Sequence, residues 1–212
     1  MLFRSGADAE ERLTESANPQ VPTDWSRGGH FLMYYELAKD TDRDLWVLPV
    51  TPDGKPEAGA KPRPFLRTPF NERFGRFSPE PNPRWVAYDS DESGRFEVYV
   101  QAFPEPKGKW LISNGGGQYP AWSADGRELF YLSADSKLMA VKLKLGEEWV
   151  QSSTPSALFD LADDGSTTGS SPFIVAPDGK RFLVRVPAET GAQPLDVIVN
   201  WPALLKKGSR TE

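Results

Sequence analysis

The stretch YPAWSADGRELFYLSADSKLMAVKL at residues 119–143 decides the fold that we expect for this chain. It predicts short strands at 119–122, 128–132 and 138–143, because each segment is rich in aromatic and aliphatic residues. The first turn carries Asp125, which can bond the local backbone, and Gly126, which accepts positive φ. A second polar turn at 133–136 reverses the chain again. The stretch therefore predicts an antiparallel meander and not a helix.

The same order of parts occurs four times along the sequence. The turn positions Ser26, Ser78, Ser123 and Ala176 follow one another at roughly 50-residue intervals. The predicted repeats span about residues 17–68, 69–113, 114–161 and 162–201, after a remnant at 1–16 and before a tail at 202–212. Outer strands are expected at 64–68, 109–113 and 156–161, whereas none follows the third strand of repeat four at 195–201.

Repeats of this length and composition are typical of β-propeller blades. A blade of four strands takes about 40–50 residues, and helical repeats of similar length would show a 3.6-residue apolar period that is missing here. The runs WVAY at 85–88 and EVYV at 97–100 are almost wholly apolar, as expected when both faces of a blade pack on neighbouring blades. A β-sandwich is the alternative, but a turn repeated at one phase argues against it. We therefore expect an all-β propeller of four-stranded antiparallel blades, with four repeat units at 1–207.

The two ends of the repeat array predict an incomplete ring. Residues 1–4 resemble the end of a third strand, and residues 11–16 form a candidate outer strand. Repeat four already has its own third strand at 195–201, so the two ends overlap instead of interlocking. Because an open arc exposes apolar blade faces, we expect the chain to belong to a larger ring or to associate with another copy.

Composition and net charge limit the classes of partner that we expect for this chain. The 212 residues are 38% hydrophobic and 12% aromatic, with 20 Pro and 18 Gly, as expected for one domain rich in strands and turns. The net charge is −5 with both signs interspersed, which disfavours nucleic acid and membrane surfaces as partners. The absence of Cys excludes disulfides and thiolate chemistry. The start lacks a signal-peptide pattern and no apolar run is long enough to span a bilayer, so we expect a soluble chain.

Several motifs resemble a known repeat family. FSP at 77–79, WSADGR at 122–127 and APDGK at 176–180 resemble the repeats of TolB-like (WD-repeat-like) propellers. More narrowly, SGRFEVYVQAFP at 93–104, KWLIS at 109–113 and VNW at 199–201 resemble the carboxy-terminal propeller of bacterial receptor-type serine/threonine protein kinases. The resemblance implies a sensing or protein-binding module in the periplasm, joined in a parent chain to a separate kinase domain.

The motifs that an enzyme would need are missing. No kinase signature is present, and the glycines Gly115, Gly116 and Gly117 are interpreted as a turn between two strands instead of a phosphate loop. The single histidine, His30, is interpreted as a turn residue, and no Gly-x-Ser-x-Gly occurs, so a catalytic triad is not expected. We predict no catalytic, cofactor-binding or metal-binding residues. The alternatives are a propeller hydrolase or lactonase, for which the first strands offer Asp24 and little else, and a structural scaffold.

Two acidic clusters match calcium-binding loops only in part, and we interpret them as ordinary loops. Asp40, Asp42 and Asp44 alternate as in a calcium loop but lack its later glycine and acid, and the acids at 89–92 belong to a hairpin. The run at 160–165 is expected to be solvated, whereas the aromatic residues at 25, 77 and 122 are expected to pack in the core. A protein or small-molecule partner is expected at the loops 39–43, 70–73, 89–95, 114–119 and 163–170, which should share one face of the propeller.

Overall fold

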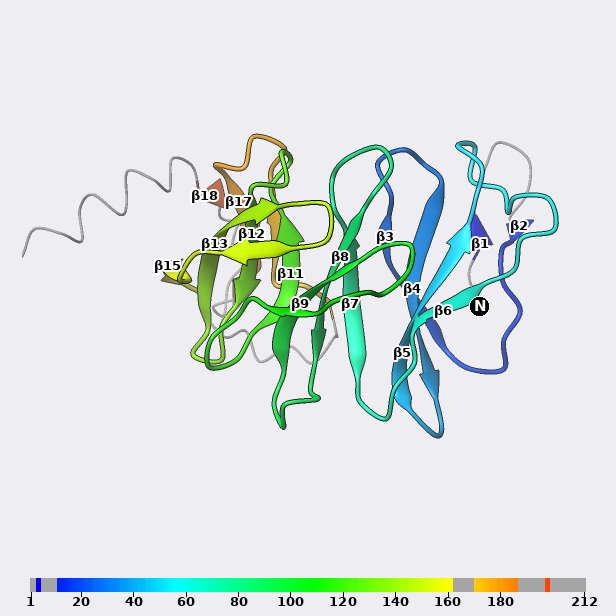
Figure 1. Cartoon of the computed structure of the whole chain (residues 1–212), viewed down its shortest axis with the longest axis horizontal. Coiled ribbons are helices and arrows are strands. Elements are labelled where there is room, and N and C mark those ends of the chain that lie inside the picture. Colours follow the sequence, from blue (N-terminus) through cyan, green and yellow to red (C-terminus); the bar gives the residue numbers. More distant parts are fainter. Residues whose placement is uncertain (1–2, 5–10, 162–169, 187–196, 199–212) are drawn as a thin grey trace, which may run out of the picture.

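The computed structural model describes residues 3–4, 11–161, 170–186 and 197–198, and these residues form strands and turns without a helix. The strands make five antiparallel sheets: one of two strands, three of four or five strands, and one of three strands (Figure 1). The described part of the chain contains no helix that could cross a membrane. The fold is an all-β propeller arc whose blades do not close into a ring.

The first two blades are four-stranded meanders, as the repeats predict. Blade 1 contains β3 (Gln20–Trp25), β4 (Phe31–Ala38), β5 (Asp42–Pro49) and β6 (Arg63–Leu66). Blade 2 contains β7 (Glu72–Phe77), β8 (Trp85–Ser90), β9 (Glu97–Ala102) and β10 (Trp110–Leu111). In both blades each strand pairs with the strand that follows it in the sequence.

Blade 3 has one strand more than the repeat predicts. Its strands are β11 (Gln118–Trp122), β12 (Glu128–Leu132), β13 (Lys137–Leu145), β14 (Val150–Ser152) and β15 (Ser156–Asp160). The long β13 pairs with the outer strand β15 along its first half and with β14 along its second half. The alternation of leucine and lysine after Val141 extends β13 into this added hairpin.

Blade 4 and the amino-terminal segment are partial sheets. Blade 4 contains β16 (Phe173–Val175), β17 (Phe182–Val184) and β18 (Val197–Ile198). The two-stranded sheet of β1 (Phe3–Arg4) and β2 (Glu11–Arg12) pairs with neither blade 1 nor blade 4. The remainder of the expected third strand at 195–201 lies outside the described residues.

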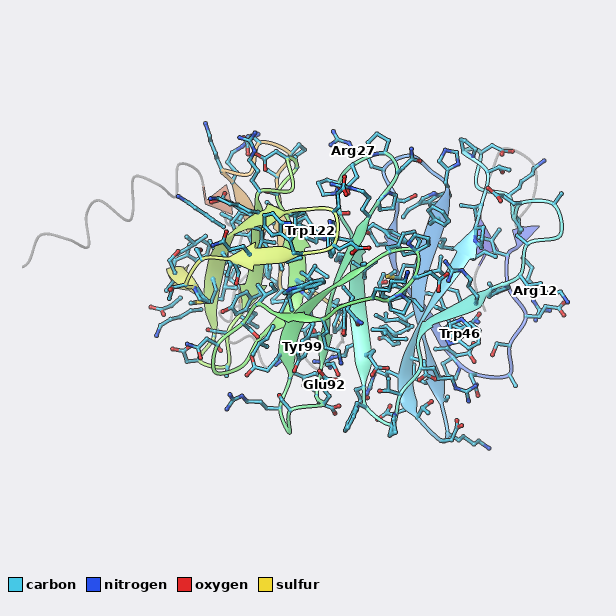
Figure 2. The ribbon with its side chains drawn as sticks, viewed as in Figure 1. Arg12, Arg27, Trp46, Glu92, Tyr99 and Trp122 are labelled. Atoms are coloured by element: carbon cyan, nitrogen blue, oxygen red, sulfur yellow. The ribbon has the colours of Figure 1, made fainter. Side chains whose placement is uncertain are left out.

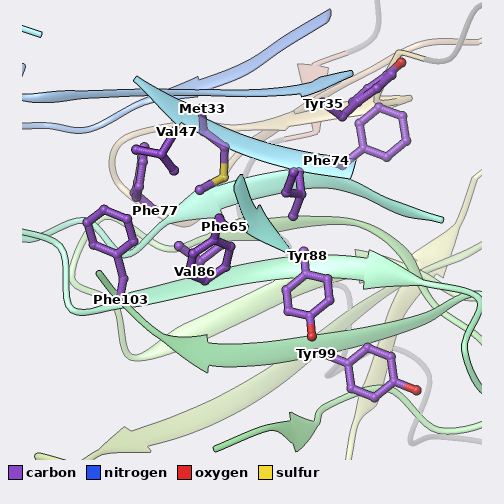
Figure 3. Packing of buried hydrophobic residues seen from close by; sticks show 11 residues of the cluster. Met33, Tyr35, Val47, Phe65, Phe74, Phe77, Val86, Tyr88, Tyr99 and Phe103 are labelled. Atoms are coloured by element: carbon purple, nitrogen blue, oxygen red, sulfur yellow. The ribbon is translucent and has the colours of Figure 1, made fainter. Parts of the chain in front are cut away.

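The blades follow one another around a common axis through their inner strands. β3 contacts β7, β7 contacts β11, and β11 contacts β16. Side chains fill the spaces between neighbouring sheets (Figure 2). Figure 3 shows the space between blades 1 and 2, where Met33 and Val47 face Phe77 and Val86. All six residues of β8 are buried. Val86 and Tyr88 pack in the cluster with blade 1, and Trp85 and Ala87 pack in the cluster with blade 3, which accounts for the apolar run at 85–88.

The predicted turns have the expected backbone. Gly126 has φ of 70° and Gly179 has φ of 65°, and each glycine lies between the first and second strands of its blade. Asp125 Oδ1 accepts hydrogen bonds from Ser123 Oγ at 2.8 Å and from the Arg127 amide at 3.1 Å. Both turn predictions are confirmed, because this chemistry depends only on neighbouring residues.

Candidate binding site in the channel

A pocket of about 710 Å³ lies along the inner strands of all four blades. Its wall is mostly apolar, and residues from the turns after β3, β7, β11 and β16 form its rim. The lining residues that matter below are Asp24, Arg27, Phe74, Arg76, Tyr119 and Trp122. Pockets of about 300–1,000 Å³ are usual for ligand sites, so this channel pocket is the candidate site.

The polar centre of the pocket is the pair Asp24 and Arg76. The Phe77 amide donates a hydrogen bond of 2.7 Å to Asp24 Oδ2, and Arg76 Nη1 lies 3.8 Å from Asp24 Oδ1. Arg76 also donates to the Thr23 carbonyl oxygen. Burial raises the pKa of Asp24, while Arg76 acts in the opposite direction. The pair therefore joins blades 1 and 2 and places both charges at the channel wall.

Bulges in the inner strands turn aromatic rings toward one another. The strand register shifts between Arg73 and Arg76 in β7 and between Gln118 and Ala121 in β11. Phe74 and Tyr119 take the positive φ values of 51° and 57° within these bulges, and their ring centroids lie 4.5 Å apart. A bulge re-aims a side chain that a regular strand would direct into the sheet face, so the bulges shape this part of the pocket.

The three aromatic residues that end the inner strands differ in burial. Phe77 is buried, and Trp122 donates from Nε1 to the Arg76 carbonyl oxygen of the preceding blade at 3.1 Å. Trp25, however, is 44% exposed. The expectation of core packing is therefore wrong for Trp25, because no described inner strand precedes blade 1 to cover it.

Arg27 is a cation at the rim of the pocket. It lies in the turn after β3, where its Nη1 donates to the Ala124 carbonyl oxygen of blade 3 at 3.2 Å; the labels of Figure 2 locate Arg27 and Trp122 on the arc. Arg27 is exposed and forms no ion pair with any described residue. Its charge is therefore open to an acidic ligand group.

The loop face, where a partner was expected, contains residues that join blades 2 and 3. Asp89 is completely buried; Arg73 Nε lies 2.7 Å from its Oδ1, and the Tyr119 amide donates to its Oδ2 at 2.9 Å. Arg73 Nη2 also donates to Gln118 Oε1 at 2.7 Å, and its guanidinium lies 3.6 Å from the Phe96 ring centroid. Burial raises the pKa of Asp89 to about 6, and Arg73 opposes the rise.

A second buried acid holds the glycine-rich segment. Glu97 accepts hydrogen bonds from the Ser113 hydroxyl, from the Gly116 amide at 2.9 Å and from Arg95 Nε at 2.7 Å. Gly115 and Gly116 have φ of 81° and 112°. The segment is thus the predicted turn between two strands, and the Gly116 amide points at a protein carboxylate.

Asp40, Asp42 and Asp44, which alternate as in a calcium loop, make contacts within blade 1. Asp42 makes a tight turn with φ of 65°, and buried Asp44 accepts a hydrogen bond of 2.6 Å from Thr41 Oγ1. Arg67 lies 2.9 Å from Asp40 and 3.7 Å from Asp44. Within the described ranges, no three acidic or histidine side chains gather to hold a metal ion.

The remaining candidate residues, Asp91, Glu92 and His30, make separate local contacts and do not form a common site. Asp91 accepts from the Asn71 amide and side chain, and Glu92 pairs with Lys109 at 2.5 Å. His30 lies in the first turn of blade 1, where its amide donates to Ser26 Oγ at 3.1 Å. Residues 163–169 of the expected loop face lie outside the described residues. Arg73 lies in the expected loop 70–73. The sequence reasoning missed Arg76, although a charged residue within the inner strand ERFGRF was a signal of a channel-facing position.

Comparison with known proteins supports the fold. No family model and no curated protein matches the chain. Among solved structures, a protein provisionally assigned as TolB from Agrobacterium tumefaciens matches with a TM-score of 0.52 and 16% identity, over 69% of this chain and 51% of that protein. Two proteins provisionally assigned as 6-phosphogluconolactonases also match: one from Bacteroides uniformis (TM-score 0.53, 15% identity, 91% of this chain, 61% of that protein) and one from Bacteroides fragilis (0.52, 17%, 87%, 51%).

These matches define the class of fold. The chain is similar to β-propellers and spans between about half and three-fifths of the length of the matched structures. At this level of identity the likeness concerns the fold alone, and propellers with one fold have many functions.

Proposed function

We propose that this chain is a non-catalytic binding module that holds an extended, acidic protein segment in its channel. The observation that carries the proposal is the pocket of about 710 Å³, which residues from all four blades line. At its rim lies Arg27, which forms no ion pair with the residues that the structure describes. The sequence placed the partner at the loop face. We place it in the channel instead, because Arg73, Asp89 and Asn71 of the loop face are engaged in contacts between and within the blades.

The charge of the pocket favours an acidic segment. Among the described lining residues, Arg27 and Arg76 stand beside one carboxylate, that of Asp24. These three groups together carry an excess of positive charge when all are ionised. Arg27 presents a planar guanidinium, which suits bidentate contact with a carboxylate. The apolar wall formed by Phe74, Tyr119 and Trp122 suits a neighbouring apolar side chain.

The hydroxyl groups of the pocket support a binding role. Ser78 Oγ accepts hydrogen bonds from the amides of Arg84 and Trp85, and Ser123 Oγ accepts from Glu128 and donates to Asp125. These serines hold the turns at the ends of β7 and β11. A serine nucleophile needs an effective general base. The only described carboxylate bonded to these serines is Asp125, whose pKa is lowered by hydrogen bonds from the Arg127 amide and Ser123, so it is a weak base.

The proposed cellular location and parent protein of the module rest on the sequence resemblance. By its likeness to the carboxy-terminal propellers of bacterial receptor-type kinases, we place the module outside the cytoplasmic membrane, in a signalling protein whose kinase domain is separate. Its partner there would be a protein whose extended segment enters the channel. We retain residues 1–207 as one propeller domain, with its repeats at about 17–68, 69–113, 114–161 and 162–201.

An immobilised array of synthetic pentapeptides tests the binding site. The array would combine Asp or Glu with Leu, Phe or Trp at each position, and would be probed with the labelled chain. Arg27→Ala should weaken binding to the acidic peptides at least about tenfold, as expected for loss of a charge-assisted hydrogen bond. Arg127→Ala is the matched control, because Arg127 is 85% exposed in the equivalent turn of blade 3 and does not line the channel pocket. Equal binding by the two variants would contradict the channel site.

A propeller hydrolase or lactonase is the second candidate function, and Asp24 is the observation that favours it. Its carboxyl group has a raised pKa in the channel wall, beside Arg76; raised carboxyl pKa values are found at acid–base sites. Lactone hydrolysis by the parent chain that is lost in Asp24→Asn would establish this function. Equal background rates for the parent chain and the variant would leave binding as the function.

A further inference from the structure

The second half of β13 has an open edge on the side of β12. β12 pairs with β13 up to Glu128 and Lys142, and just beyond this pair the Leu143 amide donates to the Arg127 carbonyl oxygen at 2.7 Å. β13 continues to Leu145, where β14 pairs with it on the other side. Among the described residues no strand pairs with Leu145 on the β12 side. The added hairpin of blade 3 therefore extends past the rest of its sheet and leaves one edge unpaired.

The backbone groups of Leu145 point to this open edge. The Gly146 amide donates to the Trp149 carbonyl oxygen at 2.8 Å on the β14 side, whereas the Leu143 amide bonds to the β12 side. Backbone donors and acceptors of successive residues in a strand point to opposite sides, so those of Leu145 have the direction of those of Leu143. Unpaired strand edges of this kind can accept a further strand.

The space beside this edge is a pocket of about 1090 Å³, which we call the edge pocket. Residues 142–145 of β13 line it, together with 125–128 from the turn after β11 and 151–153 from the end of the hairpin. Glu80 and Arg84, from the turn after β7, line it from blade 2. The described residues that line the edge pocket include none of those that line the channel pocket. An open backbone edge in a recess of this size suits an extended peptide.

The two faces of the hairpin offer different side chains to such a peptide. On one face, Leu143 is buried and Leu145 is half-buried in the cluster that joins blades 2 and 3, and Figure 1 shows the hairpin extending toward blade 2. On the other face, Lys142 and Lys144 are exposed. Because side chains alternate between the faces of a strand, an added strand would present every second residue to Leu145 and the residues between them to Lys144.

The charges of the edge pocket favour an acidic peptide. Three of the four described cations that line the pocket stand beside or opposite a carboxylate, in the pairs Arg84–Glu80, Arg127–Asp125 and Lys142–Glu128. The fourth is Lys144, whose cross-strand partner in β14 is the neutral Gln151 and which forms no ion pair with a described residue. An acidic residue on an added strand would meet this charge. The same edge of a second copy would instead bring lysines together, and like charges on facing strands are unfavourable.

We propose that the open edge of β13 binds an extended acidic segment of a partner protein as an additional strand of blade 3. The backbone of the segment exchanges hydrogen bonds with Leu145. An acidic residue of the segment lies opposite Lys144, and an apolar residue lies opposite Leu145. The partner is thus recognised by acidic and apolar residues in alternation. This second site is independent of the one proposed in the channel.

A labelled synthetic octapeptide of alternating Glu and Val residues tests the site. Its binding is measured by fluorescence anisotropy on the Arg27→Ala variant, so that the proposed channel site is weakened in every sample. Adding Lys144→Glu should raise the Kd about threefold or more, because it places like charges opposite each other. Lys61→Glu is the matched control: Lys61 is exposed in blade 1, outside both pockets, and its substitution changes the net charge equally. This control should leave the Kd unchanged.

N-methylation of the peptide distinguishes strand addition from general charge attraction. The N–H of a residue opposite Leu145 faces β13, whereas the N–H groups of the neighbouring residues face away. Methylation of the Val amides should therefore weaken binding at least about tenfold, and methylation of the Glu amides should not. The bound peptide should also slow the hydrogen exchange of the Leu145 amide.

Four results would each overturn the proposal: no binding to the Arg27→Ala variant, equal Kd values after Lys144→Glu and Lys61→Glu, equal losses on both kinds of methylation, or unchanged exchange at Leu145. Protection of the Leu145 amide that rises with the concentration of the chain, without any peptide, would show pairing between copies at this edge and would overturn it as well.

Discussion

The buried pair of Asp89 and Arg73 provides the sharpest test of how the blades are held together. Asp89→Ala removes the carboxylate that binds Arg73 Nε at 2.7 Å and the Tyr119 amide of blade 3 at 2.9 Å. Arg73 is only 14% exposed, so the substitution leaves a largely buried cation without its counter-ion and a backbone donor without its acceptor. We expect a large loss of stability for this reason.

The size of the loss follows from these two consequences. Breaking a buried ion pair by removing one partner costs about 3–5 kcal/mol, because the remaining charge stays desolvated. The remaining contacts of Arg73 with Gln118 and Phe96 offset part of that penalty. We therefore expect the free energy of unfolding to fall by about 3 kcal/mol. Adding Arg73→Met to Asp89→Ala should recover about 1–2 kcal/mol, since it removes the stranded charge.

Urea denaturation at pH 7.5, followed by tryptophan fluorescence, measures the effect. Asp135→Ala is the control, because Asp135 forms its ion pair with Lys137 on the exposed surface, and the unfolding midpoint should stay where it is. A fall of less than about 0.5 kcal/mol for Asp89→Ala would refute the reasoning, and so would a double variant less stable than Asp89→Ala alone.

Three further predictions test other parts of the fold. Gly126→Val should lower the free energy of unfolding by on the order of 1 kcal/mol or more, because φ is 70° there; chemical denaturation that shows no change would contradict the turn assignment. Burial raises the pKa of Glu72 from 4.5 to about 7. Between these two values the folded state retains a proton that the unfolded chain releases. The contribution of Glu72 to the free energy of unfolding therefore falls as the pH rises from about 4.5 to about 7. Glu72→Gln should thus stabilise the protein by on the order of 1–3 kcal/mol at pH 8 and hardly at all at pH 4; thermal melts at both pH values check this, and an equal effect at both would be contrary to it. Phe130→Ala should cost about 3–5 kcal/mol, because Phe130 is fully buried with its ring centroid 5.0 Å from that of Phe182; native blade 4 signals in hydrogen exchange would argue against that packing.

The local features of this protein follow from its sequence. The meander at 119–143 and the positive φ of Gly126 and Gly179 depend on residues a few positions apart, so pattern and turn chemistry predict them. The spacing of these turns predicts the blades, and the sheets of the described residues do not close into a ring. Asp24 was the one residue of the channel site that the sequence marked as a candidate acid.

Only the tertiary structure decides which side chains pack against each face of a blade. Trp25, Phe77 and Trp122 have the same place in their repeats, yet Trp25 is 44% exposed, because no inner strand of a preceding blade lies beside it among the described residues. Likewise, Asp89 pairs with Arg73 on the neighbouring strand of blade 2 and accepts from the Tyr119 amide across the junction with blade 3. The pocket lies where four inner strands converge. The burial and the pKa of such a side chain depend on residues of other strands and other blades, such as Tyr119 for Asp89. A local sequence pattern does not show which side chains meet between strands and between blades. The channel site and the burial of each blade face are therefore decided only by the tertiary structure.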